Sequence, residues 1–285
     1  MVTLDLTSLE NSNIKYKISK FPDGQQSITL DKPQITQRMS MILLKSRLNS
    51  FKDLELIITA NQCLREFGIE DVNLYVPYFL GGRSDRKFGE GQTNYLKNVI
   101  CPIINSQKFN KVVVIDPHSD VLEACLDNFV KIGNFELVEF ALDNINDKNI
   151  MLVSPDAGAS KKIFDVATKF QIENIVTASK LRDIKTGNII RTELPTMNLD
   201  GINHIVVIDD ICDGGRTFIE LAKAIREVTN LPIHLVVTHG IFSAGFKSLF
   251  EYFEGIYCTN SIDDIDETSF AGEKVKQLNV FNNNL

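Results

Sequence analysis

Apolar segments of strand length alternate with amphipathic segments of helix length along most of the chain. The apolar runs predict strands at residues 2–6, 13–19, 25–30, 39–45, 72–78, 111–116, 150–154, 175–179, 204–209, 233–238 and 255–259. Apolar positions at helical spacing predict helices at residues 50–68, 92–104, 159–170, 217–228 and 244–253. Apolar strands that alternate with amphipathic helices are typical of parallel sheets covered on both faces, so we expect an α/β protein.

A stretch without periodicity, residues 142–148, separates two such sets of elements and is rich in Asp and Asn. The length of 285 residues also suits two domains of ordinary size. We therefore predict two similar domains with mainly parallel sheets flanked by helices, at residues 1–142 and 143–285. Ligands of such folds bind at the carboxyl ends of the strands.

Charge, hydropathy and cysteine content argue against several classes of partner and of bound group. The net charge of −7 argues against a nucleic-acid partner, because no basic surplus offsets a phosphate backbone. No apolar stretch approaches the length of a membrane span and no charged-then-apolar leader opens the chain, so we expect no membrane partner. The five cysteines are scattered and never form a C-x-x-C pair, which favours reduced thiols in the cytoplasm over disulfides or a zinc site.

The most informative segment runs from Ile205 to Thr217, where an apolar strand ends in two carboxylates, a glycine loop and a helical pattern. A loop that opens a helix N-terminus offers free backbone N–H groups and a positive dipole end to a phosphate. Asp209 and Asp210 stand beside it, placed to accept hydrogen bonds from sugar hydroxyls or to approach Mg²⁺. The alternative is a buried strand followed by an ordinary acidic turn. The combination of carboxylates, Gly-Gly and Thr favours a phosphoribose site.

Other polar clusters follow predicted strands, and each has a simpler alternative. Three cations at residues 83–87, flanked by glycines, suit a polyphosphate, or form a solvated basic loop. His118 lies between Asp116 and Asp120, which suits a Mg²⁺ site or a hydrogen-bonded structural histidine. Asp156 precedes another helix, and the two cations of residues 180–182 open a polar excursion that is either a cleft-lining segment or a surface loop.

In order and spacing, these segments resemble the ribose-phosphate pyrophosphokinase (PRPP synthetase) family over nearly the whole chain. The family patterns are F-[SP]-D-G-E, P-Y-F-x-Y-x-R-Q-D-R-K, D-L-H-[AS], S-P-D-x-G-G, K-x-R and D-D-x-x-D-T-[AG]-G-T. They correspond to residues 21–25, 77–87, 116–119, 154–159, 180–182 and 209–217. The later T-H-G and T-N-T segments correspond to residues 238–240 and 259–261. The resemblance implies a phosphoribosyltransferase-like fold, with an ATP-contacting domain at 1–142 and a phosphoribose-binding domain at 143–285.

The resemblance also implies a role for each matching residue. ATP would be contacted by Phe21, Asp23, Gln25, Arg83 and Ser84, of which the first three belong to an adenine site completed by a neighbouring subunit. Mg²⁺ would be held by His118 and Asp156, and the catalytic cations would be Lys180 and Arg182. Ribose 5-phosphate would be bound by Arg182, Asp209, Asp210, Asp213, Gly214, Gly215, Arg216 and Thr217.

Four of the departures from the family pattern concern the ligand contacts. Gln25 stands where the family has Glu, and Ser84 where it has Gln, so the ATP contacts are expected to be looser or differently tuned. Gly214 and Arg216 stand where the family has Thr and Gly, which removes one hydroxyl donor from the phosphate loop and adds one cation. Because only twenty residues precede Phe21, we expect the family's first helix to be absent from this sequence.

The activity that the resemblance implies is ribose-phosphate diphosphokinase, in which ATP and ribose 5-phosphate give AMP and 5-phosphoribosyl 1-diphosphate (PRPP). Mg²⁺ is the implied cofactor, and self-association at least to a dimer is expected. Two alternatives remain open. One is a phosphoribosyltransferase that consumes PRPP, and the other is a catalytically silent regulatory relative that only assembles with an active enzyme.

Overall fold

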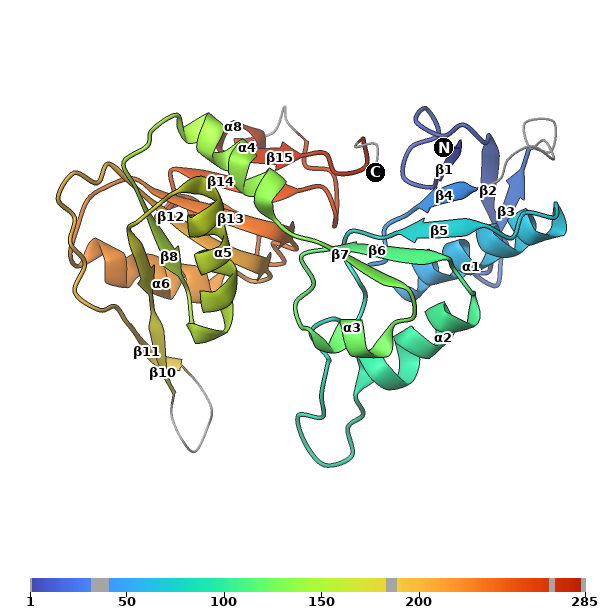
Figure 1. Ribbon diagram of the computed structural model, residues 1–285, viewed down its shortest axis with the longest axis horizontal. Coiled ribbons are helices and arrows are strands. Elements are labelled where there is room, and N and C mark those ends of the chain that lie inside the picture. The colour runs from blue at the N-terminus through green and yellow to red at the C-terminus, as the bar shows by residue number, and fades with distance from the viewer. Residues whose placement is uncertain (1, 32–40, 183–188, 267–269, 283–285) are drawn as a thin grey trace. The chain divides into compact units, whose positions relative to one another are not determined.

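The computed structural model describes residues 2–31, 41–182, 189–266 and 270–282, and for 180–182, 189–191 and 270–271 it describes the backbone alone. The chain divides into two units (Figure 1), of which unit 1 comprises Met1–Gly133 and Val280–Leu285, and unit 2 comprises Asn134–Asn279. Each unit is built around a parallel sheet of its own. The predicted α/β class with two domains of mainly parallel sheets is therefore observed.

Unit 1 contains a five-stranded sheet in which all neighbouring strands are parallel. Its strands are, in spatial order, β1 (Val2–Asp5), β4 (Ile42–Lys45), β5 (Val72–Tyr75), β6 (Lys111–Ile115) and β7 (Phe129–Ile132). Its helices are α1 (Phe51–Glu66), the π-helical turn η2 (Leu96–Ile100), α2 (Cys101–Ser106) and α3 (Val121–Cys125). A separate antiparallel hairpin of β2 (Tyr16–Lys20) and β3 (Gln26–Leu30) packs against α1.

Unit 2 contains a six-stranded parallel sheet. Its strands are, in spatial order, β15 (Val275–Leu278), β14 (Gly255–Thr259), β13 (Ile233–Gly240), β12 (His204–Cys212), β8 (Ile150–Ser154) and β9 (Ile175–Thr177). Its helices are α4 (Phe135–Ile145), the 3₁₀ turn η3 (Ala157–Ala159), α5 (Ser160–Phe170), α6 (Arg216–Arg226), α7 (Lys247–Phe250) and α8 (Phe270–Lys274). An antiparallel hairpin of β10 (Ser179–Arg182) and β11 (Ile189–Glu193) stands apart from the sheet.

Both faces of the unit 2 sheet are covered, as the apolar strands predict. Val206 and Ile208 of β12 face the core formed with α4 and α5, while Ile205 and Val207 face the core formed with α6 and α7. Because side chains alternate along a strand, β12 contributes to two cores at once. No helix in the described part of the chain is long and apolar enough to span a membrane.

The observed division differs from the predicted boundary at 142/143. Residue 142 lies inside α4, whose Leu137, Val138 and Ala141 are buried against the unit 2 sheet. The Asp and Asn residues that suggested a linker instead form the end of α4, where Asn146 adopts the left-handed conformation of a helix C-cap. The division lies at Gly133, before α4 begins.

The end of the chain returns to unit 1. The buried Tyr75 donates a hydrogen bond from its hydroxyl to the carbonyl of Val280 (2.9 Å), and the Nζ of Lys45 donates to the carbonyl of Phe281 (2.7 Å). The ring of Phe281 packs edge-on against Tyr75, and the Arg47 guanidinium lies over it. Burial lowers the pKa of Lys45, and the nearby charge of Asp5 offsets part of this shift. This segment therefore completes the core edge of unit 1.

A histidine pair lies at the amino ends of β12 and β13. The Nδ1 of His204 is 3.0 Å from the Nε2 of His234, and the Nε2 of His204 is 3.8 Å from a carboxylate oxygen of Asp147. His234 is buried beside Tyr257, and its Nδ1 has no hydrogen-bond partner among the described residues. Burial and, to a smaller extent, His204 lower the pKa of His234 to about 4.

Replacing Phe281 by Ala should destabilise unit 1 selectively. Phe281 is 2% exposed, so its truncation leaves a cavity against Tyr75 and should reduce the free energy of unfolding of this unit by ~3 kcal/mol. Urea unfolding followed by hydrogen exchange resolves the two units. Phe88→Ala, at a position 61% exposed in the same unit, is the matched control. Equal stability of the two variants would contradict the anchoring role.

Protonation of His234 should lower the free energy of unfolding in acid. The unfolded histidine takes up a proton near pH 6.5, whereas folded His234 does so only near pH 4, so stability is unaffected above pH 7 and falls between those values. Relative to His234→Gln, wild-type protein should lose about 2 to 3 kcal/mol on going from pH 7 to pH 4. Denaturant unfolding at each pH measures the difference. Parallel pH curves for the two proteins would show that His234 does not couple folding to protonation.

Candidate phosphoribose and nucleotide site

The carboxylates of Asp209 and Asp210 lie near the carboxyl end of β12. This strand pairs with β8 through Val207 and with β13 through Cys212, so its last residues extend beyond β8. The backbone N–H of Asp210 donates to the Oδ1 of Asp209 (2.9 Å). Burial, the neighbouring Asp210 and the more distant Asp156 all raise the pKa of Asp209 well above its usual range. The structure thus places the predicted carboxylates together, in an environment that favours a hydrogen-bond donor or a cation.

Lys162 of α5 is a cation at this edge that the sequence analysis did not identify. Its Nζ lies 3.9 Å from the Oδ2 of Asp210, and both side chains are largely buried. The helical pattern of α5 predicts which positions are apolar, but it does not tell which strand end its polar positions reach. Lys162 could have been found from its place in the first turn of α5, six residues after Asp156.

The predicted phosphate loop, residues 213–217, leads into α6. Gly215 is the N-cap residue in the left-handed conformation (φ +79°), and no side chain caps the helix. A Cβ at Gly215 would lie 3.1 Å from the side chain of Leu249, so glycine is required for both conformation and space. The N–H groups of Arg216 and Thr217 have no acceptor within the helix and are available to an anion.

The segment after β13 lies against this loop. The N–H groups of Ile241 and Phe242 donate to the carbonyl of Cys212, and the N–H of Ser243 donates to the carbonyl of Asp213 (3.2 Å). The hydroxyl of Ser243 also donates to the Oδ1 of Asp213 (2.6 Å). Sequence analysis did not identify Ser243, because its contact with residue 213 joins loops that lie thirty residues apart.

Asp156 is held at a helix start near the same edge. It is the N-cap of η3, and its Oδ1 accepts hydrogen bonds from the N–H groups of Gly158 (2.9 Å) and Ala159 (3.2 Å). These bonds fix the direction of the carboxylate. Its influence on the pKa of Asp209 indicates that the two carboxylates share one environment.

The two predicted catalytic cations, Lys180 and Arg182, lie in β10. Their backbone pairs with β11, Lys180 opposite Thr192 and Arg182 opposite Ile189. Their side chains are outside the described part of the structure. Their assignment therefore stays a prediction.

In unit 1, two predicted loops lie side by side. A Cβ at Gly82 would be 3.9 Å from the Cβ of His118, which brings the loop that carries Arg83 and Ser84 next to the loop that carries His118. Arg83 and His118 are exposed. Asp116, two residues before His118, is buried and has a positive φ of 40°, a conformation that is uncommon for a residue with a side chain.

The loop around Arg83 has a defined backbone. The N–H of Ser84 donates to the carbonyl of Gly81 (2.8 Å), and the carbonyl of Ser84 accepts from Leu96 (3.1 Å) at the start of η2. Gly81 has a φ of +82°, and a Cβ there would lie 2.7 Å from the Tyr95 ring. The guanidinium groups of this loop are thus presented from a fixed turn on the side of the sheet where β5 ends.

The predicted adenine-contacting residues lie in the turn between β2 and β3. The N–H of Phe21 donates to the carbonyl of Gln25 (2.8 Å), and the N–H of Gln25 donates to the Oδ1 of Asp23 (3.1 Å). Phe21 is 52% exposed. This turn is carried by a hairpin that packs on α1, not by the sheet edge that carries Arg83. An exposed aromatic ring on a well-ordered turn suits a contact with a base.

Metal binding by protein groups alone is not supported. In the described ranges, no group of three or more His, Cys, Asp or Glu side chains is arranged to hold a metal ion. The oxygen donors near Asp209 suit Mg²⁺, which is commonly held by one or two carboxylates together with substrate phosphates and water. The residues therefore fit a Mg²⁺ ion that arrives with a polyphosphate.

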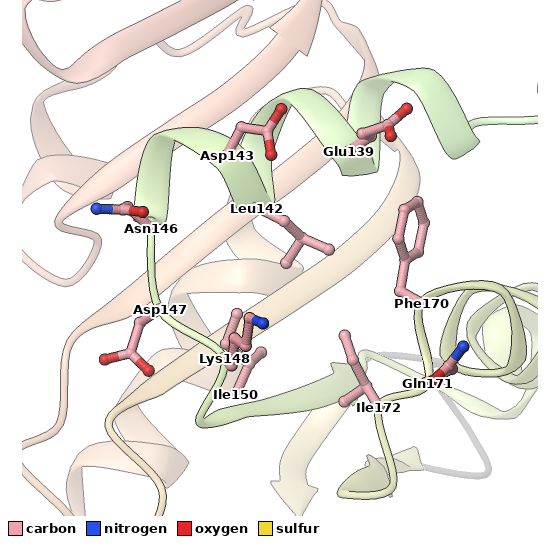
Figure 2. Close-up of a pocket in the computed structure, with 10 residues that line it drawn as sticks. All are labelled: Glu139, Leu142, Asp143, Asn146, Asp147, Lys148, Ile150, Phe170, Gln171 and Ile172. Atoms are coloured by element: carbon pink, nitrogen blue, oxygen red, sulfur yellow. The ribbon is translucent and has the colours of Figure 1, made fainter.

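A separate cavity of about 890 Å³ lies in unit 2 between the end of α4, the start of β8 and the residues after α5. Figure 2 shows Leu142, Ile150, Phe170 and Ile172 around its interior, with Glu139 and Asp143 on α4. Because it adjoins the start of β8, it lies at the opposite edge of the sheet from Asp209. It is therefore not the predicted phosphoribose site.

Comparisons with known proteins agree with this fold. No family model matches the chain. A ribose-phosphate pyrophosphokinase from Marinomonas sp. (strain MWYL1) is 26% identical over 240 residues, covering 79% of this chain and 71% of the relative. One from Saccharolobus solfataricus is 25% identical and covers 80% of this chain and 78% of the relative. One from Ureaplasma parvum is 23% identical and covers 96% of this chain and 82% of the relative.

Among solved structures, the chain is similar to phosphoribosylpyrophosphate synthetase from Mycobacterium smegmatis. The TM-score is 0.79 at 15% identity, over 95% of this chain and 88% of that chain. At this identity the likeness shows the fold. The resemblance of the chain to the ribose-phosphate pyrophosphokinase family is thus confirmed in sequence by the curated relatives, and its fold is that of a PRPP synthetase.

Proposed function

We propose that the protein is an ATP-dependent ribose-phosphate diphosphokinase that converts ATP and ribose 5-phosphate to AMP and PRPP. The observation that carries the proposal is the pairing of Asp209 and Asp210 with the uncapped, glycine-started helix α6. Such an edge offers acceptors for vicinal hydroxyls next to donors for a phosphate, which together match a phosphorylated ribose. The proposal is also supported by the curated relatives, which are named ribose-phosphate pyrophosphokinase, another term for this activity.

Ribose 5-phosphate would bind along this edge. Asp209 and Asp210 accept hydrogen bonds from the ring hydroxyls, and the N–H groups from Gly214 to Thr217 bind the 5-phosphate together with the Thr217 hydroxyl. Arg216 lies at the first turn of α6 and adds a positive charge beside the phosphate. Lys162 holds Asp210 in place by a partly buried ion pair.

ATP would be bound by groups of unit 1. Arg83 contacts the triphosphate from its fixed turn, with Ser84 beside it, and Phe21, Asp23 and Gln25 contact adenine. Because an adenine contact from the β2–β3 turn is completed across a subunit boundary in the resembled family, we propose self-association at least to a dimer. The rest of the adenine site would then come from a second copy of the chain.

The chemistry is a transfer of the β,γ-diphosphoryl group to the 1-hydroxyl of the ribose. The oxygen of that hydroxyl attacks the β-phosphorus, its proton is lost, and the bond to the α-phosphate oxygen breaks to release AMP. Such transfer depends on positioning and on neutralisation of charge, so Lys180 and Arg182 would bind the transferred group. Mg²⁺ bound with the triphosphate would supply further charge neutralisation, and the resemblance to the family assigns His118 and Asp156 to hold it.

The activity test is Mg²⁺-dependent formation of AMP. Purified protein should release AMP only when ATP and ribose 5-phosphate are both present, because the proposal joins a nucleotide site to a phosphoribose site. Chromatographic separation of AMP and PRPP measures the reaction. AMP formed only from PRPP and adenine would instead identify a phosphoribosyltransferase. Absence of either reaction, with binding of both substrates intact, would favour the regulatory alternative.

Replacing Asp209 by Asn should weaken ribose 5-phosphate selectively. The substitution keeps the shape of the side chain but removes a charged acceptor, and a hydrogen bond to a charged group contributes about 1.5–3 kcal/mol, or roughly 10- to 150-fold in affinity. Calorimetric titration should show this loss for ribose 5-phosphate and an unchanged Kd for ATP. Asp165→Asn, on the exposed face of α5, is the matched control. Selective loss of ATP binding would reverse the assignment of the two sites.

A further inference from the structure

We propose that the hydroxyl of Ser243, from the segment after β13, is a ligand of the 5-phosphate and supplies the hydroxyl that the phosphate loop lacks at Gly214. The inference rests on the proposed phosphoribose site. Within residues 213–217, Thr217 is the single residue with a hydroxyl group. A second hydroxyl reaches the loop from outside it, and that hydroxyl belongs to Ser243.

The backbone holds Ser243 in register with the loop. Three consecutive N–H groups, those of Ile241, Phe242 and Ser243, donate to the carbonyls of Cys212 and Asp213 at distances of 2.8, 3.1 and 3.2 Å. The loop and the segment therefore behave as one hydrogen-bonded layer. Phe242 adopts a positive φ of 46°, which turns the chain so that its ring is buried and the next side chain faces outward.

The ring of Phe242 explains how this turn is maintained. A Cβ at Gly240 would lie 2.1 Å from that ring, so the ring occupies space that only glycine leaves open. The ring also packs at 4.6 Å, centroid to centroid, from that of Phe246. A strained backbone held by packing at a loop is a feature of ligand sites, because it fixes a side chain in a direction that a relaxed turn would not give.

The hydroxyl lies next to the space that a side chain at position 214 would occupy. The Oγ of Ser243 is 3.8 Å from the position that a Cβ at Gly214 would occupy, and 2.6 Å from the Oδ1 of Asp213. It is also exposed. In the protein without ligand, the hydroxyl donates to Asp213. A phosphate at the N-terminus of α6 offers a stronger, dianionic acceptor, and rotation about one bond redirects the same proton to it.

The proposal can be tested by removing the hydroxyl at position 243 and adding one at position 214. The φ of Gly214 is outside the left-handed range, and a Cβ there would meet the Ser243 Oγ at 3.8 Å, an ordinary van der Waals distance, so position 214 accepts a residue with a side chain. Ser243→Ala should weaken ribose 5-phosphate about 10-fold or more, the loss expected for a hydrogen bond to a charged group. Adding Gly214→Thr to Ser243→Ala should restore most of that affinity. Ser248→Ala, at an exposed position of α7, should change nothing.

Calorimetric titration of the full chain with ribose 5-phosphate, inorganic phosphate and ATP measures these effects. The expected result is a parallel loss for the first two ligands, an unchanged Kd for ATP, and recovery in the double variant. Equal affinity of Ser243→Ala and wild-type protein would overturn the inference. Loss without recovery would also overturn it, because Ser243 would then act through the shape of the loop.

The same titrations distinguish failure of the inference from failure of the proposed function. If wild-type protein binds inorganic phosphate in a Ser243-dependent manner but does not bind ribose 5-phosphate, the phosphate ligand stands and the proposed substrate is wrong. If ribose 5-phosphate binds equally well to all variants, the substrate stands and the role of Ser243 is wrong. If neither ligand binds, both are wrong.

Discussion

The candidate site of unit 2 depends on the unequal pairing of β12, which is hydrogen-bonded over a longer stretch to β13 than to β8. β12 is hydrogen-bonded to β13 through Cys212, but to β8 only through Val207. Its middle is buried on both faces, which fixes its position in the sheet. Its last residues therefore have one covered edge and one open edge, and the carboxylates of Asp209 and Asp210 lie at this transition. A charged pair here is rigidly placed without being sealed inside the core.

Everything else at this edge arrives from other parts of the sequence. Because the strands are parallel, the residues after β8, β12 and β13 meet at the same end of the sheet. Asp156 comes after the first, the glycine loop after the second and Ser243 after the third. The connections between them are hydrogen bonds that no local pattern contains, such as those of Ser243 with Asp213. The site is thus a property of the topology as much as of any one motif.

This distinction explains what could be predicted from the sequence. The periodicity of α5 and α6 and most strands of both sheets are local signals, and the structure confirms them. The strands β7 and β15 and the helices α3 and α4 were not predicted. The predicted helix at 244–253 is reduced to α7. Lys162 and Ser243 were missed because each acts on a residue far from it in the chain.

The raised pKa of Asp209 indicates which kinds of ligand the site favours. Asp209 has a raised pKa because it is buried beside Asp210 and near Asp156, so its ionised form is penalised while no donor is present. Sugar hydroxyls and a divalent cation both favour the ionised form, and either one lowers that pKa. Binding of such a ligand is therefore coupled to release of a proton wherever Asp209 is protonated in the free protein. Lys162 lies 3.9 Å from Asp210 and contributes a positive charge to this carboxylate cluster.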